Sequence, residues 1–376
     1  MTVEGTTDRR FAAVREAFES CLADGLETGG AVAVIVDGRL VADLWGGHSD
    51  AASTTPWRRD TLVNVWSATK GVMATAVTMA VERGLLTYDA PIADLWPEFS
   101  AQGKETISLD MAMSHRAGLQ GLREPMDEAG LYGWFPYVQA LAAQAPLFAP
   151  GSLCVYHALS YGHLAGETLC RADGRFPGRF IAEEIAGPLG LDFFVGLPQD
   201  QDHRAAEMVE GPKASDWLST IDESGWGHSM HNPEIRAGHP NLRAWRAAEI
   251  PGGNGMGDAR ALATLYGTLA RGGTLGSVRL LGSQAIAAAV AERYRGPDAS
   301  FGSETAFGAG FRLAGEGGEM GASPAAFGHS GWGGTQAFAD PDAHLGFAFV
   351  THRMLGFDDG IDPRRTRLIE AVYDAL

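Results

Sequence analysis

Residue patterns typical of β-strands occur near both ends of this chain and are rare in the long stretch between them. Two β-rich runs near the N-terminus, Ala31–Val36 and Leu40–Trp45, are separated by Asp37-Gly38-Arg39. Asp-Gly between such runs is a strong hairpin signal. The runs near the C-terminus are Phe307–Leu313, Phe327–Ser330, Thr335–Ala339 and Leu345–His352. The pattern predicts one antiparallel sheet built from both chain ends, and so an α/β fold of the α+β type.

Helical periodicity fills most of the middle of the chain. The predicted helices span residues 8–26, 67–83, 134–144, 156–171, 258–271 and 362–376. Residues 200–250 show weak periodicity and are rich in His, Trp, Pro and Gly, as in a functional lid or wall. We expect residues 1–65 and 251–376 to form an α/β sheet domain and residues 66–250 a mainly helical subdomain. The active site is expected at the interface of these two parts.

Composition indicates a soluble globular protein. The chain has 376 residues, 45% of them hydrophobic, which is enough to bury a large core. Its formal charge of -17 opposes binding to nucleic acids or to anionic membrane surfaces. No signal peptide or long apolar run is present, so a cytoplasmic location is expected. Three cysteines without CxxC spacing indicate packed thiols rather than disulfides or a zinc site.

The segment Val65-Trp66-Ser67-Ala68-Thr69-Lys70 places a Ser-x-x-Lys pair at the predicted start of the helix over 67–83. Residues three positions apart share one face of a helix, so the Lys70 amine can reach the Ser67 hydroxyl. The backbone N–H groups at a helix N-terminus favour negative charge beside that oxygen. A nucleophile, a proton acceptor and an anion-stabilising field thus meet within one turn.

The same serine has a simpler interpretation as a helix N-cap, where serine often stands. The chain, however, contains three lysines, Lys70, Lys104 and Lys213, against 19 serines, so a chance pairing at this spacing is uncommon. A solvated lysine also fits poorly inside such an apolar helix. We therefore favour a catalytic pair in which burial lowers the pKa of Lys70.

Two further stretches could complete a site. In Pro150–Ala158, Tyr156 is expected at a helix start after a Pro-Gly turn, and Gly328–Thr335 is polar and glycine-rich within a β-patterned region. Together with Ser67-x-x-Lys70, these stretches resemble, in order, three motifs of the serine β-lactamase and penicillin-binding-protein superfamily. The resemblance covers about residues 8 to 376 and is closest to the family VIII carboxylesterases, whose Trp-Gly-Gly variant is similar to Trp332-Gly333-Gly334.

The resemblance implies a β-lactamase-like fold and a role for each matching residue. Ser67 would be the nucleophile, and Lys70 and Tyr156 would act as general base and general acid, with the acylation base left open between them. The backbone N–H groups of Ser67 and Trp332 would form the oxyanion hole. The residues expected to contact substrate are His329, Ser330, Gly331 and Gly333.

Two positions depart from the superfamily's pattern. Ala158 stands where β-lactamases have an asparagine, and His329 stands where they have a lysine that pairs with the substrate carboxylate. An uncharged site suits neutral esters, so we expect hydrolysis of small carboxylic esters through an acyl-enzyme. The same residues would also serve a D-amino-acid peptidase or amidase, a β-lactamase or an acyltransferase. A non-catalytic penicillin-binding-like module is a further alternative.

Other kinds of site lack their signatures in this sequence. No Gly-x-Ser-x-Gly elbow or Walker A motif occurs, Gly253–Gly257 lacks the spacing of a dinucleotide loop, and His228–His231 lacks the partners of a metal motif. We therefore expect no cofactor and no metal, and the sequence does not indicate an oligomeric state. The aromatic residues that would wall a substrate pocket or, as an alternative, belong to the core are Trp134, Phe135, Tyr137, Trp217 and Trp226.

Overall fold

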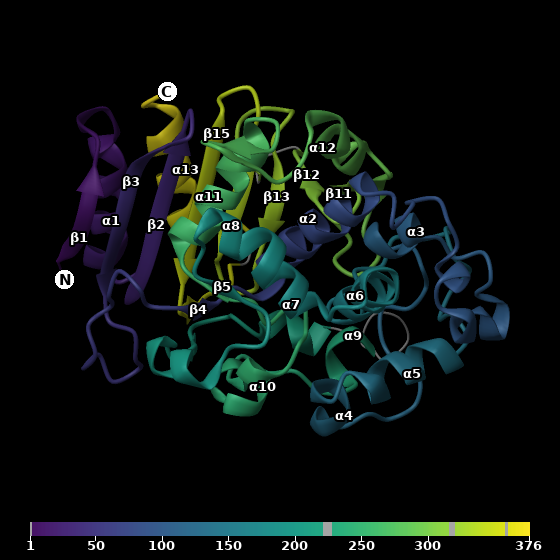
Figure 1. Ribbon diagram of the computed structural model, residues 1–376. Coiled ribbons are helices and arrows are strands. Elements are labelled where there is room, and N and C mark those ends of the chain that lie inside the picture. The colour runs from purple at the N-terminus through teal and green to yellow at the C-terminus, as the bar shows by residue number, and fades with distance from the viewer. Residues whose placement is uncertain (1, 221–227, 316–319, 358–359) are drawn as a thin grey trace.

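One antiparallel sheet built from both ends of the chain organises the molecule (Figure 1). The computed structural model describes residues 2–220, 228–315, 320–357 and 360–376. Within these residues the sheet has nine strands, in the order β1 (Val3–Thr7), β3 (Arg39–Gly47), β2 (Gly29–Val36), β15 (Leu345–Thr351), β14 (Gln336–Asp340), β13 (Phe327–Ser330), β12 (Arg312–Leu313), β11 (Glu304–Phe307) and β10 (Tyr294–Pro297). The early strand β2, in purple, pairs with the late strand β15, in yellow. The predicted fold class is confirmed.

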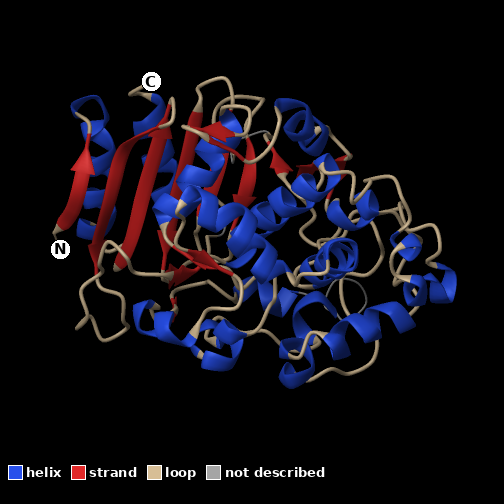
Figure 2. Ribbon diagram, in the orientation of Figure 1, coloured by secondary structure: helices blue, strands red, loops and turns tan. Residues whose placement is uncertain are grey.

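Both faces of strand β2 are buried, which explains its continuous apolar sequence. Alternate residues of a strand point to opposite faces. Val32 and Val34 pack on the side covered by α1 (Ala12–Ala23) and α13 (Pro363–Tyr373). Ala31, Ala33 and Ile35 pack on the other side, which α11 (Ala259–Ala270) covers. The sheet is therefore the middle layer between two layers of helices (Figure 2).

Helix α11 approaches the sheet closely because glycines face each other at the contact. A Cβ atom on Gly346 of β15 would lie 2.2 Å from the backbone nitrogen of Gly267 in α11. A Cβ atom on Gly267 would lie 2.8 Å from Ile35 Cγ2. Either methyl group would force the helix away from the sheet, so both positions require glycine.

Helices and short strands fill the rest of the chain. The remaining helices are α2 (Thr69–Glu82), α3 (Leu109–Met113), α4 (Glu128–Tyr132), α5 (Phe135–Ala143), α6 (Ser160–Asp173), α7 (Pro177–Ile181), α8 (Gly187–Leu189), α9 (His228–His231), α10 (Arg243–Ala247) and α12 (Ser283–Val290). The short strands outside the main sheet are β4 (Val63–Asn64), β5 (Phe193–Phe194), β6 (Val209–Glu210), β7 (Met256–Gly257), β8 (Thr274–Leu275), β9 (Val278–Arg279) and β16 (Arg353–Met354). Helix α2 is buried along almost its whole length and packs against α6, α7, α12 and β13.

Two predictions about secondary structure were wrong, and two edge strands were missed. Residues 307–313 are not one strand: β11 ends at Phe307, and the chain turns through Gly308–Gly310 before β12 pairs Arg312 back with Phe307. The helix predicted over 156–171 begins at Ser160 instead. The edge strands β1 and β10 were not predicted, because their sequences lack the apolar character of buried strands.

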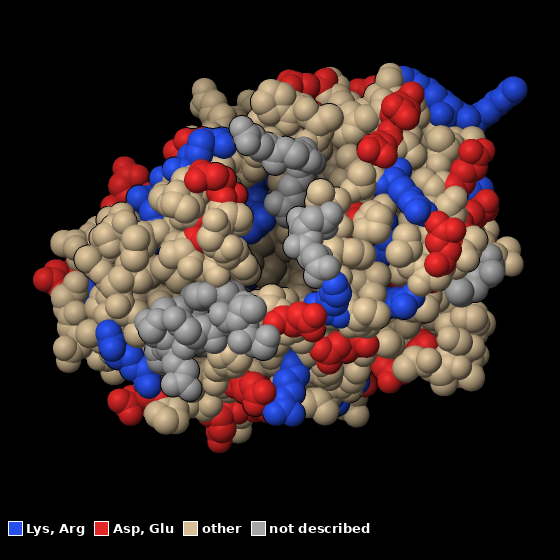
Figure 3. Space-filling model, turned by 180° about the vertical axis from the view of Figure 1, so that it is seen from behind, with Lys and Arg blue, Asp and Glu red and all other residues tan. Residues whose placement is uncertain are grey.

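Acidic and basic side chains are interspersed on the face of the molecule shown in Figure 3, and a hollow opens near the middle of that face. No single sign of charge dominates this surface. Among the described residues, every helix is too short or too polar to cross a lipid bilayer.

Candidate active site

Ser67 lies in a tight 3₁₀ turn, Trp66–Ala68, that leads directly into α2. The residue before it, Trp66, has a positive φ of 48°, a conformation that is strained for a bulky residue. Trp66 is held there by aromatic packing, with its ring centroid 4.8 Å from that of Trp332 and 5.6 Å from that of Trp245. The turn thus presents Ser67 at a fixed position at the N-terminal end of a buried helix.

Lys70 is completely buried, and its amine makes three hydrogen-bonding contacts. Nζ lies 3.0 Å from Ser67 Oγ, as the i,i+3 spacing predicts. It also lies 2.7 Å from the carbonyl oxygen of Ala158 and 2.6 Å from that of Gly252. Burial lowers the pKa of Lys70 well below 10.5, and the nearby charge of Arg312 lowers it further.

The two carbonyl contacts fix the orientation of the neutral amine. A neutral lysine has two N–H groups and one lone pair, and a carbonyl oxygen can only accept a hydrogen bond. If the N–H groups donate to Ala158 and Gly252, the lone pair is left for Ser67. In this arrangement the serine hydroxyl donates to the amine, which is the direction in which a proton must move to activate the serine.

Tyr156 lies next to Lys70 in a segment without regular secondary structure before α6. Its ring centroid is 4.7 Å from Lys70 Nζ, and its side chain is 7% exposed. The backbone N–H of Tyr156 donates to Ser300 Oγ at 2.7 Å and to Asp298 Oδ1 at 3.3 Å. These long-range contacts hold the tyrosine outside the helix, which is why the predicted helix start at residue 156 was wrong.

The ring of His115 packs against the ring of Tyr156. The two ring centroids are 4.6 Å apart, and His115 Nδ1 accepts a hydrogen bond of 3.0 Å from the backbone N–H of His157. Burial lowers the pKa of His115 well below 6.5. His115 therefore acts as a neutral structural support for the segment that carries the tyrosine.

The glycine-rich stretch follows strand β13 as a tight turn, Gly331–Gly334. Gly333 and Gly334 have positive φ values of 87° and 135°. A Cβ atom on Gly331 would lie 2.3 Å from the carbonyl oxygen of Val65, so the turn packs on the backbone just before Ser67. Among the backbone hydrogen bonds outside helices and strands of the described residues, none is donated by the N–H of Ser67 or of Trp332. Both groups are therefore candidate donors to a ligand.

His329 borders the site as a neutral imidazole. It is 1% exposed, and burial lowers its pKa well below 6.5, with further lowering by Lys70 and Arg312. Nδ1 lies 2.7 Å from the carbonyl oxygen of Ser330 and must donate to it. Nε2 is therefore an acceptor, and it has no partner within the described part of the chain. The position carries no positive charge near neutral pH.

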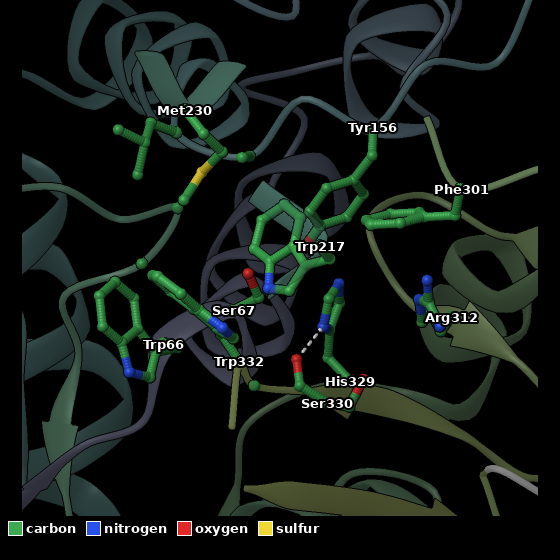
Figure 4. A pocket seen from close by; sticks show the side chains of 15 residues that line it. Trp66, Ser67, Tyr156, Trp217, Met230, Phe301, Arg312, His329, Ser330 and Trp332 are labelled. Atoms are coloured by element: carbon green, nitrogen blue, oxygen red, sulfur yellow. Dashed lines mark hydrogen bonds between the residues drawn. The ribbon is translucent and has the colours of Figure 1, made fainter. Parts of the chain in front are cut away.

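These residues surround a pocket with a volume of about 250 Å³ (Figure 4). Six of the candidate site residues line it: Ser67, Tyr156, His329, Ser330, Gly331 and Trp332. Lys70 lies beneath Ser67. Gly333, which was expected to contact substrate, is not among the residues that line the pocket, and a Cβ atom on it would lie 2.5 Å from Met354 Cβ. The pocket-lining residues that sequence reasoning did not assign to the site are Trp66, Leu159, Met230, Gly252, Gly253, Phe301 and Arg312.

The predicted aromatic residues divide between pocket and core. Trp217 lines the pocket, with its ring centroid 5.4 Å from that of Trp332. Trp134 and Tyr137 belong to the hydrophobic core, and Phe135 is 55% exposed. Trp226 lies outside the described residues.

Over the residues that the structure describes, no group of three or more His, Cys, Asp or Glu side chains is arranged to hold a metal ion. The chemistry available in the pocket is that of a serine hydroxyl, a buried amine, a phenol and two backbone N–H groups. This combination can carry out acyl transfer.

Comparison with known proteins identifies related chains. The family model described as Beta-lactamase matches residues 14–371. The chain is 35% identical over 364 residues to "Esterase/beta-lactamase LipL" of Mycobacterium tuberculosis, covering 94% of this chain and 83% of the relative.

Solved structures agree with this relationship along the full length. A structure described as a family VIII carboxylesterase has a TM-score of 0.93 and 42% sequence identity, with 100% of both chains covered. A structure described as a penicillin-binding protein homologue from Caulobacter crescentus has a TM-score of 0.92 and 40% identity, again with 100% of both chains covered.

Proposed function

This chain belongs to the Beta-lactamase family, and on that premise we propose that it is a serine carboxylesterase that cleaves small esters through an acyl-enzyme on Ser67. The observation that carries the proposal is the contact of 3.0 Å between Lys70 Nζ and Ser67 Oγ. Both of the amine's other contacts are carbonyl acceptors, so once Lys70 is deprotonated its lone pair is left for the nucleophile.

In acylation, Lys70 removes the Ser67 proton as Oγ attacks the ester carbonyl carbon. The negative charge that develops on the carbonyl oxygen is met by the backbone N–H groups of Ser67 and Trp332, and losing one such donor typically costs about 10²–10³ in rate. Tyr156 lies beside Lys70 and passes the proton to the leaving alkoxide, so that the alcohol departs neutral. In deacylation the same groups remove a proton from water as its oxygen attacks the acyl carbonyl carbon. They return the proton to Ser67 Oγ as its bond to the acyl group breaks and the carboxylic acid is released.

The pocket supports neutral esters as the substrate class. Its walls are largely aromatic (Figure 4). Trp66 packs on Trp332, Trp217 contacts the rings of both Trp332 and Phe301, and Phe301 lies beside Tyr156. Neutral His329 offers no cation for a substrate carboxylate, and the charged side chain in the lining is that of Arg312. The Ala158 carbonyl oxygen accepts a hydrogen bond from Lys70, and its side chain in the pocket is a methyl group where β-lactamases have the amide of an asparagine. The names of two relatives, an esterase/β-lactamase and a family VIII carboxylesterase, are in line with this substrate class.

The proposal is tested with short-chain p-nitrophenyl esters. The wild-type protein should release a burst of p-nitrophenol followed by steady turnover, and a fluorophosphonate probe should label Ser67 when the site is mapped by mass spectrometry. Ser67→Ala should lose both the burst and the label. Full turnover by Ser67→Ala would reject the proposal.

A penicillin-binding activity is the second candidate, because one full-length relative at 40% identity is described as a penicillin-binding protein homologue. Such a protein would be acylated by a penicillin at Ser67 and would release the product slowly. Labelling with a fluorescent penicillin, in competition with the p-nitrophenyl ester, separates the candidates. A stable penicillin adduct without ester turnover would favour this second function.

A further inference from the structure

Arg364 is a fully buried residue in the first turn of α13 whose guanidinium reaches the turn Gly331–Gly334. Its side chain is 0% exposed. Nη2 donates to the Gly333 carbonyl oxygen at 2.8 Å and to Asp362 Oδ2 at 2.7 Å. A charged group from the C-terminal helix thus binds the backbone of the turn that carries Trp332.

The other donors of Arg364 are also occupied. Nη1 donates to Glu27 Oε2 at 3.0 Å and to the Arg353 carbonyl oxygen at 2.8 Å, and Nε donates to Asp362 Oδ1 at 3.1 Å. Burial acts to lower the pKa of Arg364, but Glu27 and Asp362 outweigh it and raise the pKa. The guanidinium is therefore charged and held in one orientation by segments that are far apart in the sequence.

The turn itself depends on such outside contacts. Its glycines lack side chains and have wide backbone freedom, so their own sequence does not fix their position. The Gly333 carbonyl oxygen accepts from Arg364 and from the backbone N–H of Leu355 at 3.0 Å. A Cβ atom on Gly334 would lie 2.2 Å from Arg364 Nη2, so the guanidinium packs directly on the turn.

We propose that Arg364 is a positioning residue for the oxyanion hole, because by holding the Gly333 carbonyl it fixes the turn and with it the Trp332 N–H. This inference rests on the proposed function. An oxyanion donor acts only within hydrogen-bond distance of the oxygen that gains charge in the transition state. A displaced donor therefore lowers kcat and leaves KM nearly unchanged.

The test compares Arg364→Lys with Glu27→Gln as the matched control. A lysine ammonium stays charged between Glu27 and Asp362 but lacks the planar fork that also reaches Gly333. Glu27→Gln loosens the same buried cluster, and the hydrogen bonds of Glu27 go to Thr28, Gly29 and Arg364 rather than to the turn. Both variants should lower the melting temperature. Arg364→Lys should lower kcat about 10- to 100-fold, part of the loss of a whole oxyanion donor, whereas Glu27→Gln should stay within about threefold of the wild type.

A second readout reports the oxyanion hole directly. Phenylboronic acid adds to a serine oxygen to form a tetrahedral anion that resembles the transition state. Its inhibition constant should rise in Arg364→Lys by about the same factor as kcat falls. Arg364→Gln replaces the lysine variant, with the same expectations, if the latter does not fold.

Two outcomes would overturn the inference. One is an Arg364→Lys protein with unchanged kcat and unchanged boronate affinity, and the other is an equal loss of both quantities in Glu27→Gln, which would show a general structural role. If the wild-type protein gives neither an ester burst nor boronate inhibition, the proposed function is refuted, and this inference with it.

Discussion

Lys70 Nζ lies 2.6 Å from the carbonyl oxygen of Gly252, which is 182 positions further along the chain. With Ala158 as the second acceptor at 2.7 Å, this contact brings three distant segments together at one nitrogen atom. The chain has a second buried lysine, Lys104, whose Nζ contacts the carbonyl oxygens of Ala101 at 2.6 Å, Ala142 at 2.9 Å and Gln144. Lys104 has no serine partner among these contacts, so it is a natural control for Lys70.

The lowered pKa of Lys70 predicts a rising pH dependence for acylation. The protonated amine cannot accept the Ser67 proton, so the burst rate should increase as Lys70 loses its proton and reach a plateau well below pH 10.5. Stopped-flow measurements of the p-nitrophenyl ester burst check this. Lys70→Met should abolish the burst, while Lys104→Met should retain it. A wild-type burst rate that still rises as for an ordinary lysine, up to pH 10.5, would contradict the prediction.

The same shift predicts a pH dependence of stability. Between the lowered folded-state pKa and 10.5, the unfolded chain binds the Lys70 proton and the folded protein does not. The free energy of unfolding should therefore rise with pH over this window. Urea denaturation of the wild type and of Lys70→Met at several pH values measures it, and the slope due to Lys70 should vanish in the variant. If the free energy of unfolding had the same slope against pH in the two proteins, the lowered pKa of Lys70 would be refuted.

Tyr156→Phe should separate proton transfer from nucleophilic attack. General acid–base groups contribute typically about 10²–10⁴ in rate, so kcat should fall by that order while the fold stays intact. The matched control is Tyr161→Phe, since Tyr161 also lies beside Lys70, with its ring centroid 5.7 Å from Nζ. Tyr161 donates to the Lys70 backbone carbonyl at 3.3 Å and should affect kcat only a few-fold. Equal losses in both variants would argue against a specific role for Tyr156.

His329→Lys should shift the substrate preference toward anions. A lysine at this position introduces a positive charge where the imidazole is neutral, so an ester with a carboxylate group should gain relative to a neutral ester. We expect the ratio of the two kcat/KM values to change by about tenfold, which corresponds to about 1.4 kcal/mol of charge interaction. The control His329→Gln is neutral and should leave the ratio near that of the wild type. An unchanged ratio in the lysine variant would place the substrate's acidic group elsewhere.

Gly71→Ala should destabilise the protein at the helix that carries the site. A Cβ atom on Gly71 would lie 1.9 Å from the Tyr266 hydroxyl oxygen, and overpacking of this kind costs typically about 1–3 kcal/mol. Tyr266 Oη is buried without a hydrogen-bond partner among the described residues, so removing it costs little. The double variant Gly71→Ala/Tyr266→Phe should recover most of the loss in a denaturation experiment. Additive effects of the two substitutions would show that the clash is not the cause.

The parts of the fold that the sequence predicted are those that contribute many apolar residues to the core. Helices α1 and α13 have apolar residues at helical spacing because each buries one face, whereas α2, β2 and β15 are apolar almost throughout because they are buried on all sides. The edge strands β1 and β10 contribute few apolar residues, because they expose part of their surface to solvent. Tyr156 was predicted to begin a helix because its local sequence allows one, whereas contacts to Asp298 and Ser300 hold it outside the helix, which begins at Ser160.

The sequence by itself determined the pairing of Ser67 with Lys70, since two side chains three positions apart on one turn must meet. The tertiary structure alone decided that Lys70 is buried, that its N–H groups are taken by Ala158 and Gly252, and that Arg364 reaches Gly333. All three of these acceptors are backbone carbonyls. Every residue has a carbonyl group, so the sequence does not indicate which carbonyl will accept a hydrogen bond from a buried lysine or arginine. The packing of distant segments decides it.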